Sequence, residues 1–173
     1  APPGGVERAL LFHTLGYLAT QESEYATAIE RYSVALHLRE AAGATLSAAK
    51  TLRDIGVAYA CLGDYERAKT AFDGALCDFA HFGDQYDWAM TLMDLGVVFL
   101  ELGDPVQSQA CLDRAEPVFV TIGSGRQLAR LYNNRGRTQQ ALGQPDNAAA
   151  SFEVSLHWGR ITGATYEIAN TLD

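Results

Sequence analysis

The sequence of 173 residues lacks three features that mark other classes of protein: long apolar runs, paired cysteines and an excess of basic residues. No stretch approaches the 18 consecutive apolar residues of a membrane-spanning helix, so a membrane is not an expected partner. Lysine and arginine number 13 against 21 acidic residues, and the resulting net charge of −8 repels a phosphate backbone. Nucleic acid is therefore not an expected partner either.

Cysteine is scarce, being present only at Cys61, Cys77 and Cys111, and no two cysteines form a C-x-x-C pair. The odd number and the wide spacing argue against a disulfide framework or a zinc site, and they favour a reducing compartment. We expect buried, reduced thiols in a cytoplasmic protein. The first residues also lack the basic segment of a secretory signal, which agrees with that location.

The common motifs of catalysis and cofactor binding are missing as well. The sequence contains no phosphate-binding G-x-x-x-x-G-K, no dinucleotide-binding G-x-G-x-x-G, no metal-binding H-E-x-x-H and no nucleophile motif G-x-S-x-G. It therefore predicts neither an enzyme nor a bound cofactor or metal.

Glycine, in contrast, is frequent and regularly spaced. One column of glycines recurs every 40 residues, at Gly16, Gly56, Gly96 and Gly136. A column of small residues and a column of large residues follow it with the same spacing. These two columns are Ala28, Ala68, Ser108, Ala148 and Tyr32, Phe72, Leu112, Phe152. A register held through four copies without an insertion indicates a structural repeat.

Each unit of the repeat is predicted to form two helices. Apolar residues recur at helical spacing in the first half of a unit, as at Leu46, Ala49 and Leu52. Gly63 can then end the first helix in the left-handed conformation, and Asp64 can cap the second. Each helix should have about 18 residues and a length of roughly 27 Å. Pro117 lies inside a second helix, which it should kink or shorten.

The glycine, alanine and aromatic columns resemble the tetratricopeptide repeat in a lengthened, 40-residue form, over nearly the whole chain. Within that family the sequence is most similar to Pins-type adaptor arrays and to sensor regions of bacterial signal-transducing ATPase regulators. It departs from the usual 34-residue repeat, and glycine replaces the usual terminal proline. The resemblance implies an all-α fold, a right-handed superhelical solenoid of antiparallel helical hairpins.

The predicted organisation is a single repeat domain over residues 1–173. Its repeats are 5–44, 45–84, 85–124 and 125–164, with part of a fifth at 165–173. Because the fifth repeat stops partway, we expect the chain to be a piece of a longer protein. Its uncovered repeat face predicts end-to-end self-association.

The resemblance also implies where a partner would bind, because the first helix of each hairpin lines the concave groove in this family. The groove residues singled out here are Lys50, Arg53, Met90, Met93, Val97, Arg130, Asn133 and Arg137. Methionine offers an adaptable apolar seat, and arginine suits a carboxylate. The expected partner is a protein or an amphipathic peptide with an apolar centre and acidic flanks.

The fourth unit is more polar than the others, because Arg135 and Gln139 stand in columns that hold Ile55 and Tyr59. Their alkyl stems should cover apolar surface while the polar heads reach water. Ordinary surface variation, a partner contact and a small-molecule site all stay open as explanations. The favoured function is a non-catalytic protein-interaction scaffold. The alternative is an effector-sensing segment of a larger transcriptional or signalling regulator.

Overall fold

The structure is a computed structural model that describes residues 4–163. These residues form eight α-helices and no β-strand, so the all-α prediction is confirmed. The helices are α1 (Gly5–Gln21), α2 (Tyr25–Ala41), α3 (Thr45–Cys61), α4 (Tyr65–Phe82), α5 (Gln85–Glu101), α6 (Pro105–Ile122), α7 (Gly125–Ala141) and α8 (Pro145–Thr162). The fifth repeat and its predicted packing lie outside the described residues.

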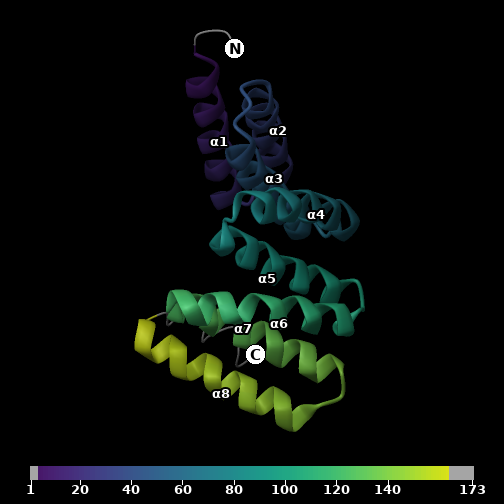
Figure 1. Cartoon of the computed structure of the whole chain (residues 1–173). Coiled ribbons are helices and arrows are strands. Elements are labelled where there is room, and N and C mark those ends of the chain that lie inside the picture. The colour runs from purple at the N-terminus through teal and green to yellow at the C-terminus, as the bar shows by residue number, and fades with distance from the viewer. Residues whose placement is uncertain (1–3, 164–173) are drawn as a thin grey trace. The chain divides into compact units, whose positions relative to one another are not determined.

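The chain divides into two compact units between Thr91 and Leu92, within α5. In the first unit, α1 packs against α2, α2 against α3, and α3 against α4 (Figure 1). In the second unit, α6 packs against α7, and α7 pairs with α8. Each unit thus consists of helices that contact their neighbours in the chain.

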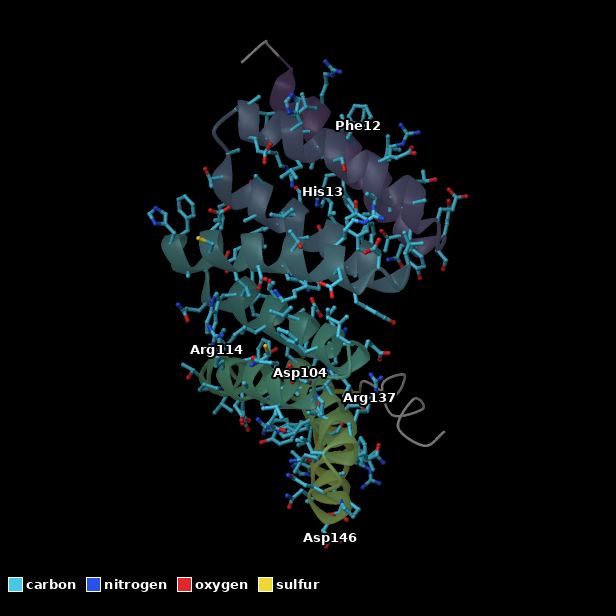
Figure 2. The ribbon with its side chains drawn as sticks, turned by 90° about the vertical axis from the view of Figure 1, so that its right-hand side faces the viewer. Phe12, His13, Asp104, Arg114, Arg137 and Asp146 are labelled. Atoms are coloured by element: carbon cyan, nitrogen blue, oxygen red, sulfur yellow. The ribbon has the colours of Figure 1, made fainter. Side chains whose placement is uncertain are left out.

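The turns between the helices follow the predicted chemistry. Gly63, just after the end of α3, has a φ angle of 76°, so it adopts the left-handed conformation that glycine favours. The carboxylate of Asp64 accepts a hydrogen bond from the backbone N–H of Arg67 and so caps α4. Pro105 and Pro145 begin α6 and α8, where the missing N–H has no helical partner to lose. Figure 2 shows Asp146 at the N-terminal tip of α8.

The glycine column allows the two helices of a hairpin to pack closely. A Cβ atom added to Gly56 would lie 2.6 Å from the Phe72 ring, and one added to Gly136 would lie 2.3 Å from Phe152. Gly96 differs, because it faces Leu112 and an added Cβ would be 3.4 Å away. The aromatic column therefore fills the space that the glycine hydrogen leaves.

Two sequence predictions need correction at this level. Of the kink or shortening expected at Pro117, the shortening does not occur, because α6 continues through Pro117 to Ile122 and has 18 residues, as α4 and α8 do; the kink stays a prediction. The thiols of Cys61 and Cys77 are exposed, and only Cys111 is buried. The number of cysteines does not show which side of a helix each one lies on, so the exposure of Cys61 and Cys77 could not be predicted from it.

Helix α1 carries an unusual amount of exposed apolar surface. Leu15 is 39% exposed, whereas Ile55 of the same column is 5% exposed. Leu11 and Leu18 are likewise 56% and 50% exposed. In the first unit, α2 covers the equivalent face of α3 through Tyr32. That face of α1 has no such neighbour among the described residues.

Candidate partner-binding face

The predicted groove residues lie on the first helices of the hairpins, which are α1, α3 and the start of α5 in the first unit and the rest of α5 and α7 in the second. Within each unit, the side of these helices that carries the predicted residues is called its first-helix face below. In the first unit, Lys50 on α3 contacts two carboxylates at the start of α5. Its Nζ lies 2.6 Å from Asp87 Oδ2 and 3.2 Å from Asp84 Oδ2. The hydrogen bond with Asp87 raises the pKa of Lys50, and burial opposes this only in part. Lys50 is therefore a paired cation.

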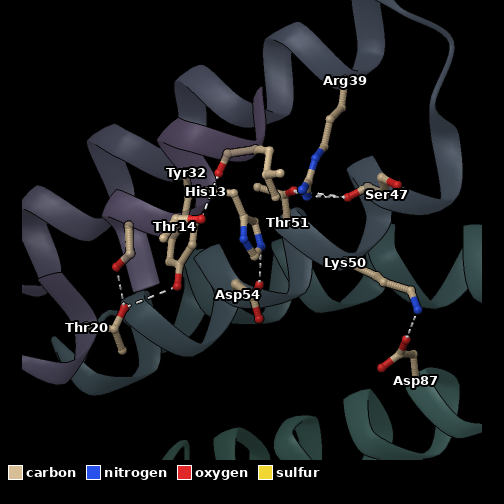
Figure 3. Close-up of polar contacts among 12 residues, drawn as sticks. His13, Thr14, Thr20, Tyr32, Arg39, Ser47, Lys50, Thr51, Asp54 and Asp87 are labelled. Atoms are coloured by element: carbon tan, nitrogen blue, oxygen red, sulfur yellow. Dashed lines mark hydrogen bonds and ion pairs between the residues drawn. The ribbon is translucent and has the colours of Figure 1, made fainter. Parts of the chain in front are cut away.

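A second polar contact in this unit joins α1 to α3. The Nε2 atom of His13 lies 2.9 Å from Asp54 Oδ2 (Figure 3). Two further groove positions on α1, Leu10 and Tyr17, are 61% and 54% exposed. The first unit thus presents exposed apolar side chains on α1 beside paired charges on α3.

In the second unit, two ion pairs join α5 to α7. Arg130 lies 3.6 Å from Asp94, and Arg137 lies 2.9 Å from Glu101. On each helix the two residues are seven positions apart, so the pairs repeat after two helical turns. We call these four residues the α5–α7 ladder. Asn133 is half-buried and lies one turn from both arginines on α7.

The remaining predicted groove residues differ in their exposure. Arg53 and Val97 are half-buried. Met93 has no exposed surface and Met90 is 8% exposed, so both methionines are core side chains and the prediction that they form an open seat is wrong. Leu92 and Leu95 of the same helix are buried as well. Because α5 is apolar on more than one side, the sequence did not show which of its apolar residues face the groove.

The predicted basic residues of the face are paired with acids. Lys50, Arg130 and Arg137 each contact a carboxylate of a neighbouring first helix. Asp84 accepts the backbone N–H of Asp87, and it also contacts Lys50. The face therefore carries charges of both signs in close pairs.

A second polar cluster lies between α6 and α7, away from the ladder. Arg135 is 8% exposed, and its guanidinium contacts Asp113 at 2.7 Å and Glu116 at 2.9 Å. The hydroxyl of Tyr132 donates a hydrogen bond to Glu116. Burial raises the pKa of Glu116, but Tyr132 and Arg135 outweigh it and hold that pKa below its ordinary value. The prediction that the Arg135 head reaches water is wrong.

The other polar substitutions of the fourth repeat are also satisfied inside the protein. Ser108 and Thr138 share a hydrogen bond of 2.8 Å, and the Ser151 hydroxyl donates to Gln139 Oε1 at 2.7 Å. Both contacts join neighbouring helices of the second unit. The polar residues of α7 therefore form two groups. One group packs against neighbouring helices, and the other lies on the first-helix face.

Residues 4–163 contain no group of three or more histidine, cysteine, aspartate or glutamate side chains that could hold a metal ion. Over the same residues, no helix combines the length and the hydropathy needed to cross a bilayer.

Comparison with known proteins gives the class of this fold. The family model of the tetratricopeptide repeat matches residues 129–156. No curated protein matches the sequence significantly. Among solved structures, apo RapI aligns with a TM-score of 0.88 at 16% identity, over 96% of this chain and 61% of RapI.

Two more solved structures show the same arrangement. The Rap conjugation gene regulator of plasmid pLS20, in complex with the Phr* peptide, aligns with a TM-score of 0.85 at 15% identity, over 96% of this chain and 46% of that one. The TPR-like repeats of a Podospora anserina kinesin light chain align with a TM-score of 0.71 at 15% identity, over 91% of this chain and 77% of that one. The chain thus spans less than two thirds of the length of either Rap protein.

The fold is therefore an all-α helical-repeat solenoid of the tetratricopeptide type, and the resemblance seen in the sequence columns is confirmed. The narrower resemblance to Pins-type adaptors and to ATPase regulators stays a prediction.

Proposed function

We propose that this chain is a non-catalytic interaction scaffold of the cytoplasm, and that it binds a peptide or a partner's helix on its first-helix face. The α5–α7 ladder carries this proposal. It places two arginines, each with a partly exposed side chain, two turns apart on α7 with Asn133 between them. The side chains of Arg137 and Glu101 are 45% and 36% exposed, and an exposed ion pair contributes about 0–1 kcal/mol, so a ligand carboxylate can exchange for Glu101 at little cost.

The chemistry of the ladder suits the acidic part of an amphipathic peptide. A guanidinium binds a carboxylate through two parallel hydrogen bonds, and this favours Arg130 and Arg137 as anchors for acidic side chains. Asn133 carries a donor and an acceptor in one side chain, which matches a peptide group of the ligand. The apolar part of the peptide would contact Val97, which is half-buried and lies between Asp94 and Glu101 on α5.

The location rests on a separate observation. Cys61 and Cys77 are free and exposed, and such thiols persist in a reducing compartment.

The test is a binding assay with peptides selected from a displayed random library on the unmodified chain. The variant Arg130→Gln with Arg137→Gln removes both cations without adding a repulsive charge. We expect it to bind the selected peptides several-fold more weakly and with a smaller salt dependence, because two charge contacts are lost. Arg31→Gln is the matched control, since Arg31 is an exposed arginine of α2.

The predicted thermal stability of the double variant is close to that of the parent, because exposed pairs stabilise little. Selected peptides that bind the double variant, the control and the parent equally would contradict the proposal. The ladder would then be a solvated helix surface.

The pLS20 regulator, which was solved with a peptide, favours a second candidate function. In this alternative the chain senses a peptide effector and passes a change of shape to the rest of a larger regulator. Spin labels on Cys77 and on Arg160→Cys, in a Cys61→Ser background, would report the distance between the two units. A scaffold predicts an unchanged distance distribution when a selected peptide binds, whereas a sensor predicts a shift.

A further inference from the structure

The first unit contains a cavity of about 160 Å³ where α1, the end of α2 and the start of α3 meet. It is lined mainly by apolar side chains, with one charged residue among them. The lining includes Val6, Ala9, Leu10, Leu38, Arg39 and Ala42. Neither the sequence motifs nor the α5–α7 ladder account for this cavity.

The repeat columns explain why the cavity exists. At the next junction the position of Arg39 is held by Phe79, which is fully buried and packs with Ala49 and Trp88. Two further columns change in the same direction. Ala42 and Ala48 stand where the next repeat has Phe82 and Trp88. Phe82 is 50% exposed, so Phe79 and Trp88 are the aromatic side chains that fill the second junction and that the first one lacks.

Arg39 gives this cavity a charged group with unused donors. Its Nη1 donates to the carbonyl oxygen of Ser47 at 2.9 Å and to the hydroxyl of Thr51 (Figure 3). Burial lowers the pKa of Arg39, and the Asp54 carboxylate opposes this at a distance. No carboxylate between residues 4 and 163 forms an ion pair with it. A guanidinium has five N–H donors, and both contacts use the same nitrogen.

We propose that this cavity binds a small aromatic carboxylic acid. The ring would lie beside Arg39 against Val6, Ala9 and Leu38, and the carboxylate would pair with the Arg39 guanidinium. An apolar protein cavity of about 150 Å³ holds a benzene molecule, so the space suffices for one ring. A carboxylate bound to a partly desolvated guanidinium forms a strong, charge-assisted hydrogen bond. The site is separate from the ladder and does not depend on the proposed peptide.

The experiment uses 3-phenylpropionate as the probe and 3-phenylpropan-1-ol as its neutral match. Methyl resonances of Val6 and Leu38 would be followed by NMR during titration of each compound into the whole chain. We expect saturable shifts with the acid and at least about tenfold weaker binding of the alcohol, because the alcohol cannot form the ion pair. The variant Arg39→Met should reduce binding of the acid to the level of the alcohol.

A second variant keeps the test valid if Arg39→Met folds poorly. Ala42 lines the cavity, so the ring of Ala42→Phe should fill it, abolish binding of the acid and leave the melting temperature unchanged or higher. The proposal is overturned if the acid causes no saturable shift, if the alcohol binds as tightly as the acid, or if a folded Ala42→Phe protein still binds the acid.

Discussion

The Nη1 atom of Arg135 on α7 lies 2.9 Å from Oε2 of Glu116 on α6. In the repeat columns these two positions correspond to Ile55 and Leu36, which pack in one apolar cluster of the first unit. A charged pair thus replaces an apolar pair at one junction of the repeats. The attraction within such a pair is opposed by the cost of removing both charges from water, so the pair need not stabilise the fold relative to two apolar residues.

The first prediction concerns this replacement. Arg135→Ile alone should destabilise the protein by about 3 kcal/mol, because Glu116 is left without its cation in a partly buried site. The double variant Arg135→Ile with Glu116→Leu should recover most of that loss or exceed the parent. Denaturant unfolding of the parent, both single variants and the double variant measures the coupling. A double variant with the summed loss of the single variants would contradict this account.

The second prediction is the pH dependence of the same pair. The pKa of Glu116 is lower in the folded protein than its ordinary value of 4.5, so its contribution to stability is present above that pH. The contribution is lost as the pH falls through the lowered pKa of the folded state. The parent should therefore lose more stability below pH 4.5 than the Arg135→Ile, Glu116→Leu variant does. Parallel stability curves in acid would rule this out.

The repeat columns predicted much of the fold, because they report on local geometry. A glycine such as Gly56 is required by the ring it touches, and Gly63 is required by its positive φ. The ring contact recurs at Gly16 and Gly136, and the positive φ recurs at Gly103 and Gly143, so the spacing of 40 residues reveals both requirements.

The candidate site was harder to predict, because it depends on contacts between residues far apart in the chain. The partner of Arg137 is Glu101, 36 residues earlier, and no local pattern links the two. Burial of Met93 depends likewise on how neighbouring helices cover α5. The cavity beside Arg39 exists because the first junction has smaller or polar side chains where the second has Phe79 and Trp88. Only a comparison of equivalent repeat positions can suggest this.

The third prediction contrasts two glycines of one column. Gly56→Ala should be destabilising by about 1–3 kcal/mol, because its Cβ would lie 2.6 Å from the buried Phe72 ring. Gly96→Ala should be neutral or stabilising by up to about 1 kcal/mol, because the Cβ meets Leu112 at 3.4 Å and alanine favours a helix. Thermal unfolding of the two variants gives the comparison. Equal losses would show that the aromatic column does not set the glycine requirement.

The fourth prediction contrasts two equivalent apolar positions. Ile55→Ala should destabilise by about 2–5 kcal/mol, because Ile55 is 5% exposed. Leu15→Ala should cost less than about 1 kcal/mol in the monomer, since Leu15 is 39% exposed and loses little buried area. The measurement is made on dilute samples, so that self-association of the chain does not contribute to its stability. A large loss at Leu15 would mean that its face is covered in solution.

The most direct test of the scaffold is a hydrogen-exchange footprint of a selected peptide bound to the unmodified chain. We expect the added protection to fall on the first helices of the second unit, α5 and α7, and to be strongest around Arg130, Asn133 and Arg137. Arg130→Gln with Arg137→Gln should remove the protection on α7. Protection confined to α2, α4, α6 and α8, or a footprint unchanged in that variant, would contradict the proposed binding face.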